Sequence, residues 1–430
     1  MLIASMRSMV RTSEQLNSAG KSYNYIHMRA DLPHRSTTIV LIAALCVFST
    51  QFGVTVIAPL LGVWVAASAA PFLVAAVIFS AFTMVSTPLN IPGGMLSDRW
   101  GRKPLIVAGL SLYALASALF PFSTDPYDWI FVRAIQGAGA GLFFPAITAL
   151  LSEVTSSEER GRAVGVYNIG LGLGLAVGPA SGGILFDNYG LYTPFFVCVV
   201  FALISVVLVV LFVEEPGERV IRRGRELALR EYERRLLLLA GLVIFFGIGV
   251  AAIMGALFSP YALALEHLKL SAGFIGIILS IMFLVFAVLQ LGLTRLMQRL
   301  GALVLALAGL ILCSGGLLIL YQATSVLELV LMSVLLGTGL GAVSLGTLTL
   351  ATTVAGTVEG DQERRGKVMG IYYTVFYAGL GGIPLLCGAL SELVGARVLF
   401  LGYAALLLVV TGVAWRLGMG TGTSHVREPA

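Results

Sequence analysis

The sequence predicts an all-α integral membrane protein, with twelve transmembrane helices arranged as two pseudo-symmetric bundles of six. Three observations carry this prediction. Apolar residues make up 58% of the 430 residues and charged residues only 11%, against about 25% charged residues in an average soluble domain. Twelve apolar stretches are each long enough to cross a bilayer, and the second half of the chain repeats motifs of the first half.

A helix that crosses the hydrocarbon core of a membrane needs about 20 apolar residues. The connection between the first two predicted helices, residues 61–70, contains no charged residue and is the least clearly marked boundary. We expect the spans at 38–60, 71–92, 104–122, 128–151, 163–186, 191–213, 236–261, 271–294, 302–321, 325–352, 367–390 and 396–416.

Basic residues gather on one side of this predicted bundle. All Lys and Arg residues except Arg133, Lys269 and Arg397 lie in the tails or in the loops that follow even-numbered helices. The positive-inside rule makes that side cytoplasmic. We therefore expect a multi-pass protein of the plasma (inner) membrane with both termini in the cytoplasm. The opposite side carries acidic residues, which are Asp125, Asp187, Glu266, Glu328 and Glu392.

The boundaries divide the chain into five parts. Two six-helix bundles, 38–213 and 236–416, lie between a cytoplasmic tail 1–37, a charged linker 214–235 and a second tail 417–430. The first tail lacks the pattern of a cleavable signal peptide, and Met28 is an alternative start to Met1. The linker carries seven arginines and six glutamates. We interpret it as a solvated helix, with a regulatory site as the alternative.

An internal repeat relates the two bundles. Residues 161–167 recur as residues 366–372, an offset of 205 that also relates Pro179 to Pro384. Earlier in each half the offset is 200. Two such units in the same orientation imply a pseudo-two-fold axis along the membrane normal, with a path between the halves. The matching glycines are Gly183 and Gly388, Gly190 and Gly395, Gly101 and Gly301, Gly137 and Gly337, and Gly139 and Gly339.

Three motifs carry a resemblance to a known family. Residues 93–104 read GGMLSDRWGRKP, residues 133–139 read RAIQGAG, and residues 174–183 read GLAVGPASGG. These resemble three signature motifs of the major facilitator superfamily. The third resembles the antiporter motif of its twelve-helix drug-efflux branch, whose members exchange drugs for protons. The resemblance extends from about residue 38 to residue 416.

The first motif predicts an inner gate. Gly94 and Gly101 allow a tight turn and a close helix approach, and Asp98 is an anion suited to a helix N-terminus. The resemblance implies that Asp98 meets the helix that starts near Gly366, and that Arg102 pairs with Glu153. This contact would hold the inner face shut. In the alternative interpretation, the basic residues Arg99, Arg102 and Lys103 only anchor the topology.

Arg133 is the one basic residue well inside a predicted helix. It lies roughly 8 Å from the helix start, so its side chain could reach the outer surface. Charges within the membrane are otherwise costly and usually functional. The resemblance makes Arg133 and Gln136 part of a polar network near the cavity, linked to proton or substrate movement. Other residues predicted to face the cavity are Gln51, Tyr167, Asn168, Tyr372 and Tyr373.

The fifth predicted helix carries the third motif. Glycines every four residues let a neighbouring backbone approach closely, and Pro179 removes a helix hydrogen bond and bends the chain. The residues predict packing, and the resemblance adds the antiporter role. The members of this packing motif are Gly174, Gly178, Pro179, Gly182 and Gly183.

Together these features predict a secondary transporter, not an enzyme, that works by alternating access. We expect it to export a small hydrophobic or amphipathic compound across the lipid bilayer as a monomer. The alternatives are a proton-coupled importer of a small metabolite and a non-transporting receptor with the same fold. The resemblance implies protons as coupling ion, although no carboxylate lies mid-membrane. Dispersed Cys and His residues predict no metal and no cofactor, and scattered basic clusters no nucleic-acid partner.

Overall fold

The computed structural model describes residues 36–123, 125–156, 159–215, 230–356 and 362–419. Within these ranges the chain is helical and forms no strand. Twelve helical segments are long and apolar enough to cross a membrane, as the sequence predicted. Nearly all of the predicted tails, 1–37 and 417–430, and most of the linker 214–235 fall outside the described residues.

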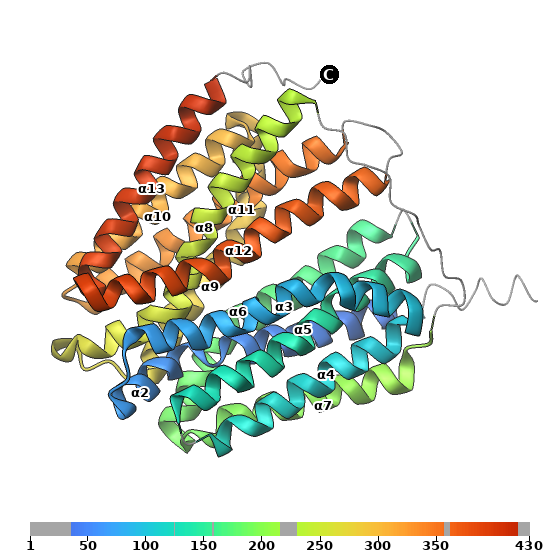
Figure 1. Ribbon diagram of the computed structural model, residues 1–430, viewed down its shortest axis with the longest axis horizontal. Helices are drawn as coiled ribbons and strands as arrows, with labels where there is room; N and C mark the ends of the chain where they lie inside the picture. The colour runs from blue at the N-terminus through green and yellow to red at the C-terminus, as the bar shows by residue number, and fades with distance from the viewer. Residues whose placement is uncertain (1–35, 124, 157–158, 216–229, 357–361, 420–430) are drawn as a thin grey trace, which may run out of the picture.

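The helices of each half follow one another with short connections (Figure 1). The first half starts with a helix over residues 36–55. It continues with α2 (Ala58–Ser68), α3 (Phe72–Trp100), α4 (Arg102–Leu119), the short η1 (Phe120–Phe122), α5 (Pro126–Val154), α6 (Arg160–Tyr189) and α7 (Tyr192–Phe212). The second half contains α8 (Glu231–Ala264), η2 (Glu266–Leu268), α9 (Ala272–Leu300), α10 (Ala302–Gln322), α11 (Val326–Gly356), α12 (Gln362–Val394) and α13 (Ala396–Met419).

The first predicted boundary was wrong. The helix breaks for two residues at 56–57, resumes as α2 and ends at Ser68, so the predicted loop 61–70 is mostly helical. The break precedes Pro59, whose ring lacks an N–H and collides with the carbonyl four residues earlier in a continuous helix. Pro59 then lies in the first turn of α2, where prolines are favoured. The uncharged residues 61–68 offer no signal for a loop.

Four glycines with positive φ explain part of the internal repeat. Gly101 and Gly301 have φ of 111° and 87°, and each separates two consecutive helices. Gly190 and Gly395, both with φ of 82°, end α6 and α12. Residues with a side chain rarely adopt this conformation. Each pair is related by an offset of the repeat, so both halves use glycine to make the same turns.

The helix packing also repeats between the halves. A methyl group added to Gly137 on α5 would collide with the carbonyl of Phe82 on α3. At an offset of 200, a methyl group on Gly337 of α11 would collide with the carbonyl of Met282 on α9. Such backbone approach is possible only where small residues lie at the interface. The two six-helix bundles therefore share one architecture.

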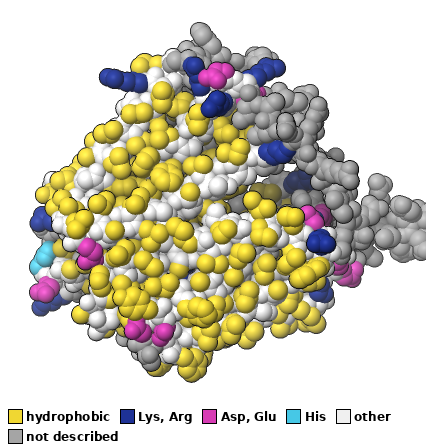
Figure 2. Space-filling model, in the orientation of Figure 1, with side chains coloured by type: hydrophobic (Ala, Val, Ile, Leu, Met, Phe, Trp, Pro, Cys, Tyr) yellow, Lys and Arg dark blue, Asp and Glu magenta, His cyan; other side chains and the backbone are white. Residues whose placement is uncertain are grey.

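The two halves contact each other mainly through three helix pairs, α6 with α9, α3 with α12, and α2 with α8, with smaller contacts of α3 with α8 and of α2 with α9. We call the end of the molecule where α3 meets α4 the motif end, and the end where α6 ends and α9 begins the far end. In Figure 1 the halves meet at the far end, on the left, and separate toward the motif end. Figure 2 shows a hollow between them near the motif end, and a mainly hydrophobic surface between the two charged ends.

Candidate functional site

The first motif builds a cluster of charges at the motif end. Gly101 turns the chain so that Asp98, near the end of α3, faces Arg102 at the start of α4. The Arg102 guanidinium donates to Asp98 Oδ1 at 2.6 Å and to Glu153 Oε1, on α5, at 2.7 Å. It also donates to Ser97 Oγ at 3.0 Å. Arg102 therefore pairs with Glu153, as the resemblance implies, and ties α3, α4 and α5 together.

The other residues of this motif occupy distinct positions. Gly94 faces α5, where an added methyl group would lie 3.7 Å from Pro145 Cβ. Arg99 is exposed. Among the described residues, the hydrogen-bond partner of Asp98 is Arg102 of its own half. The side chains at residues 362–366, around the predicted partner helix start near Gly366, are not described.

Glu215 completes the cluster, and the sequence did not single it out. Its carboxylate accepts from the backbone N–H groups of Arg102 at 2.6 Å and Lys103 at 2.9 Å. The N-cap of α4 is Gly101, which has no side chain to bond these groups. Glu215 supplies the missing cap from beyond α7, while Lys103 Nζ donates to the Val210 carbonyl of α7. The first turn of α4 contains no acidic residue of its own, and this was the sequence signal that a cap must come from elsewhere.

Glu215→Gln should lower transport by roughly two- to fivefold, because a carboxylate at an exposed helix N-terminus contributes about 0.3–1 kcal/mol. Transport assays on equal amounts of membrane-inserted protein test this. Glu231→Gln makes the same charge change at the same end, in an exposed pair with Arg235, and should behave as wild type. Equal rates for all three proteins would show that this cap does not contribute to transport.

A second polar cluster lies deep in the first half, around Arg133. The side chain is 1% exposed, so it does not extend to the outer surface, which contradicts that alternative. Its guanidinium donates to Gln136 Oε1 at 2.6 Å, and to the carbonyls of Val54 and Ile78, both at 3.4 Å. It also lies over the Phe82 ring, 4.9 Å from the centroid. No acidic side chain bonds it within the described ranges.

Among the described residues, this arrangement leaves a buried cation without a counter-ion. Desolvating a guanidinium is expensive, and such groups are rarely kept in membrane helices without a function. Among the described residues, Arg133 and Glu233 are the two charged residues that are buried, and Glu233 lies in the first turn of α8. Gln136 Nε2 donates to the Gly53 carbonyl at 3.2 Å, so the cluster links α5 to the first helix.

Two tyrosines of the first half, Tyr113 and Tyr167, are wholly or partly buried. Tyr113 of α4 is buried, and its hydroxyl has no hydrogen-bond partner among the described residues. Tyr167 of α6 is partly buried and packs against the hydrophobic core of the first half. The sequence missed Tyr113, whose ring packs against Gly139; an added methyl group there would lie 3.1 Å from the ring.

The remaining predicted cavity residues are less closely grouped. Tyr372 is buried, and its hydroxyl lies 3.1 Å from Thr347 Oγ1 on α11, in its own half. Tyr373 is partly exposed and contacts Tyr372 ring to ring. Gln51 packs against Gly174, and Asn168 is exposed. These contacts do not bring the five predicted cavity residues together among the described residues.

The packing motif of α6 has two faces. Methyl groups added to Gly174, Gly178 or Gly182 would collide with the end of the first helix or the two residues that follow it. One added to Gly183 would collide with Ala272 of α9, in the other half. The carbonyl of Pro179 lies against Gly276 of α9 in the same way. The motif thus packs α6 within its half and also against the second half.

Hydrogen bonds close the far end between the halves. Ala180 N–H of α6 donates to Ser280 Oγ of α9 at 2.9 Å. Ser259 Oγ of α8 donates to the Pro59 carbonyl at 2.6 Å and accepts from Gly62 N–H at 3.2 Å, both on α2. Toward the motif end the two halves separate (Figure 1). No atom lies within 4 Å of a methyl group added to Gly161 or Gly165 of α6, to Gly292 of α9 or to Gly370 of α12.

Gly276→Val should prevent closure of the far end, because its side chain would occupy the space of the Pro179 carbonyl. We expect transport below about one tenth of wild type, since overpacking a close contact costs about 1–3 kcal/mol. Gly292→Val is a matched control on the same helix, where the added side chain meets open space. Labelling of a cysteine introduced at the far end should increase in the first variant only. Unchanged labelling in both would contradict this.

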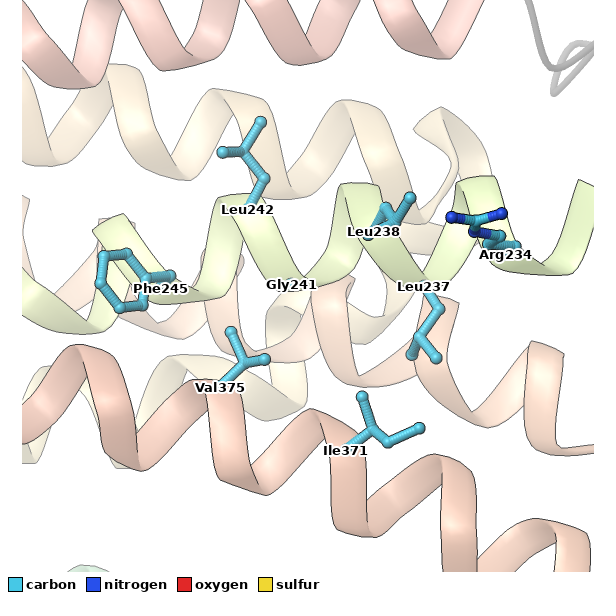
Figure 3. A pocket seen from close by; sticks show the side chains of 8 residues that line it. All are labelled: Arg234, Leu237, Leu238, Gly241, Leu242, Phe245, Ile371 and Val375. Carbon is cyan, nitrogen blue, oxygen red and sulfur yellow. The ribbon is translucent and has the colours of Figure 1, made fainter. Parts of the chain in front are cut away.

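An apolar pocket of about 390 Å³ opens between α8 and α12. Figure 3 shows Val375 and Ile371 of α12 pointing toward α8, where Leu242 and Phe245 also line the pocket, with Arg234 at one end. Leu237, Leu238 and Gly241 complete its walls. No residue of the Arg133 cluster lines it. The pocket and the polar cluster are therefore separate features of the molecule.

Twelve membrane-crossing helices in two repeated halves define a multi-pass membrane protein. The family model of the Major Facilitator Superfamily matches residues 43–360 and 244–429. The chain belongs to this superfamily, and it is a transporter, not an enzyme, with a small-molecule substrate.

Relatives and solved structures agree with this assignment. Multidrug resistance protein 2 of Bacillus subtilis is 27% identical over 400 residues, covering 88% of this chain and 95% of that protein. An uncharacterized MFS-type transporter of Methanocaldococcus jannaschii is 23% identical over 372 residues, covering 85% and 94%. The fold is also that of a solved structure, a bacterial homolog of the human lysosomal transporter Spinster in an inward-facing and unoccupied conformation. The TM-score is 0.73 and the sequence identity is 15%, and the match covers 91% of this chain and 98% of that chain.

Proposed function

We propose that this transporter works by alternating access and exports a small hydrophobic or amphipathic compound from the cytoplasm. The observation that carries the proposal is the contrast between its ends. The halves are bonded together at the far end and separated at the motif end, around a buried polar cluster. Rocking residues 38–213 against 236–416 would reverse this contrast and expose the cluster to the other side of the membrane.

Membrane orientation is part of the same proposal. With basic residues concentrated at the motif end, the positive-inside rule supports a cytoplasmic motif end and cytoplasmic termini in the inner membrane. The described conformation would then be open to the cytoplasm. The Asp98, Arg102 and Glu153 cluster would be the inner gate, in the released state. One chain contains both halves, so a monomer would have a complete path.

The interior supports an apolar or amphipathic substrate. Arg133 and the tyrosines supply few polar contacts, while the pocket between α8 and α12 is almost entirely apolar. Beyond Arg133 and Glu233, a strongly charged substrate would find no charged partner among the described buried residues. Similarity to multidrug resistance proteins of Bacillus subtilis, at 27% and 25% identity, favours export of such compounds. We propose that Arg133 and Gln136 contact the substrate or couple its binding to the movement of the halves.

Inside-out membrane vesicles that contain the protein test the proposal. We expect them to accumulate neutral or amphipathic dyes faster than vesicles from cells without the protein. The panel should include matched anionic, cationic and neutral dyes, each with the pH gradient imposed and then collapsed. Dependence on the gradient would identify protons as the coupling ion. Movement of polar metabolites in the opposite direction, with no dye accumulation, would support an importer and overturn the proposal.

A further inference from the structure

Two acidic side chains cross between the halves at the far end. The Asp187 carboxylate, near the end of α6, accepts from the Gly273 N–H at 2.7 Å. The Glu392 carboxylate, near the end of α12, accepts from the Leu73 N–H at 3.2 Å. Gly273 is the second residue of α9 and Leu73 the second residue of α3. Each carboxylate therefore caps the N-terminus of a helix that belongs to the other half.

The internal repeat relates these two contacts. Adding 205 to 187 gives 392, and adding 200 to 73 gives 273, which are the two offsets found in the sequence. The glycines beside the acids follow the same rule. Gly183 packs against Ala272 and Gly273, and Gly388 packs against Leu73 and Ala76. One device therefore occurs twice, once on each side of the pseudo-two-fold axis.

Physical chemistry explains why these positions suit an anion. The first N–H groups of a helix lack partners within the helix, and its dipole favours negative charge there. The N-cap of α3 is Pro71, which forms no side-chain cap. Glu392 supplies the bond that Pro71 cannot make. In α9, Ser271 caps Phe274 at 3.2 Å, and Asp187 bonds the neighbouring Gly273.

We propose that Asp187 and Glu392 form an outer latch that stabilises the conformation closed at the far end. When the far end opens, α6 separates from α9 and α3 from α12, so both carboxylates leave their helix N-termini for water. The contacts exist in only one state, and they therefore shift the balance between the states. The latch rests on the proposed alternating access, but it does not depend on the substrate or on the direction of transport.

The repeat also makes the two ends unequal. The far end has an acidic cap on both sides of the axis. At the motif end, the position that matches Asp98 is Gln298, so only the first half supplies an acid. Two repeat-related carboxylates hold the far end, whereas at the motif end the repeat-related positions supply one, Asp98. This difference favours the described conformation in the absence of substrate.

Distances between spin labels test the latch in the full-length protein in lipid. The native cysteines are buried, and labels would be placed in a variant that lacks them. Phe122 and Leu327 are exposed sites for the far end, and Leu211 and Leu417 for the motif end. In the double variant D187N/E392Q we expect the far-end distances to lengthen and the motif-end distances to shorten. Each single change should shift the ratio of the states by roughly two- to fivefold.

Controls separate a latch from a structural role. Glu266→Gln removes an acid at the same end that bonds no helix of the other half in the described structure, and should leave the distances unchanged. D187E/E392D keeps both carboxylates and should restore most of the wild-type distribution. If the double variant matches Glu266→Gln, or if both ends loosen together, the latch is wrong. Because the distances are measured without substrate, that result would leave the proposed export intact.

Discussion

Replacing Arg133 with methionine should reduce transport to less than about one tenth of wild type without unfolding the protein. Methionine keeps the length and the apolar part of the side chain but removes the charge. Exchanging a buried charge for an apolar group of similar volume is often neutral for stability, because the desolvation cost disappears. The substitution would remove the guanidinium N–H groups of Arg133, which donate to Gln136 and to the Val54 and Ile78 carbonyls.

The expected loss follows from the position of the cation. Arg133 is buried, bonds three groups from three helices, and has no acidic partner among the described residues. A group of this kind contributes little to folding, so its retention points to substrate binding or to coupling. Lysine keeps the charge but not the planar arrangement of donors. Arg133→Lys should therefore retain only part of the activity.

The repeat offers a matched control for this prediction. Ser333 occupies the position that corresponds to Arg133, and within the described residues it bonds the Leu329 carbonyl of its own helix and no other group. Ser333→Ala should transport as wild type does. Transport rates and thermal unfolding in detergent would be measured on all variants together. Wild-type transport by Arg133→Met would show that the arginine only joins neighbouring helices.

The sequence was sufficient to predict the helices and the repeat, because both depend on local patterns. Runs of about 20 apolar residues must form helices in lipid, where every backbone polar group needs a partner within the segment. Glycines at matching offsets marked the turns at Gly101, Gly190, Gly301 and Gly395, each of which has positive φ. The extension of α2 to Ser68 was missed, since an uncharged apolar stretch reads equally well as the end of a helix or as a loop.

The contacts between distant segments could not be read from the sequence. Glu215 caps α4 across more than a hundred residues, and Glu392 caps α3 across more than three hundred. Nothing in the local pattern of either acid distinguishes it from other acids at helix ends. Asp98 differs in another way. Its role in the resemblance depends on a conformation in which the motif end is closed, and the described conformation is open there.

Asp98→Asn should lower transport about tenfold while the protein remains inserted in the membrane. The carboxylate bonds Arg102 in the described conformation, and we propose that it binds the N-terminus of α12 when the motif end closes. A charge at a helix N-terminus contributes up to about 2 kcal/mol in partly buried geometry, and about 1.4 kcal/mol corresponds to a factor of ten. Asparagine keeps the shape but loses the charge, so the closed motif end becomes rarer and each cycle slower.

A combination of variants makes this prediction sharper. Asp98→Asn should favour the conformation open at the motif end, whereas loss of Asp187 and Glu392 should favour the opposite one. The triple variant should therefore transport faster than Asp98→Asn alone, because the two shifts oppose each other. Gln298→Asn, at the matching position of the second half, is the control and should have no effect. If the triple variant is slower than Asp98→Asn, the acids at the two ends do not act on one equilibrium.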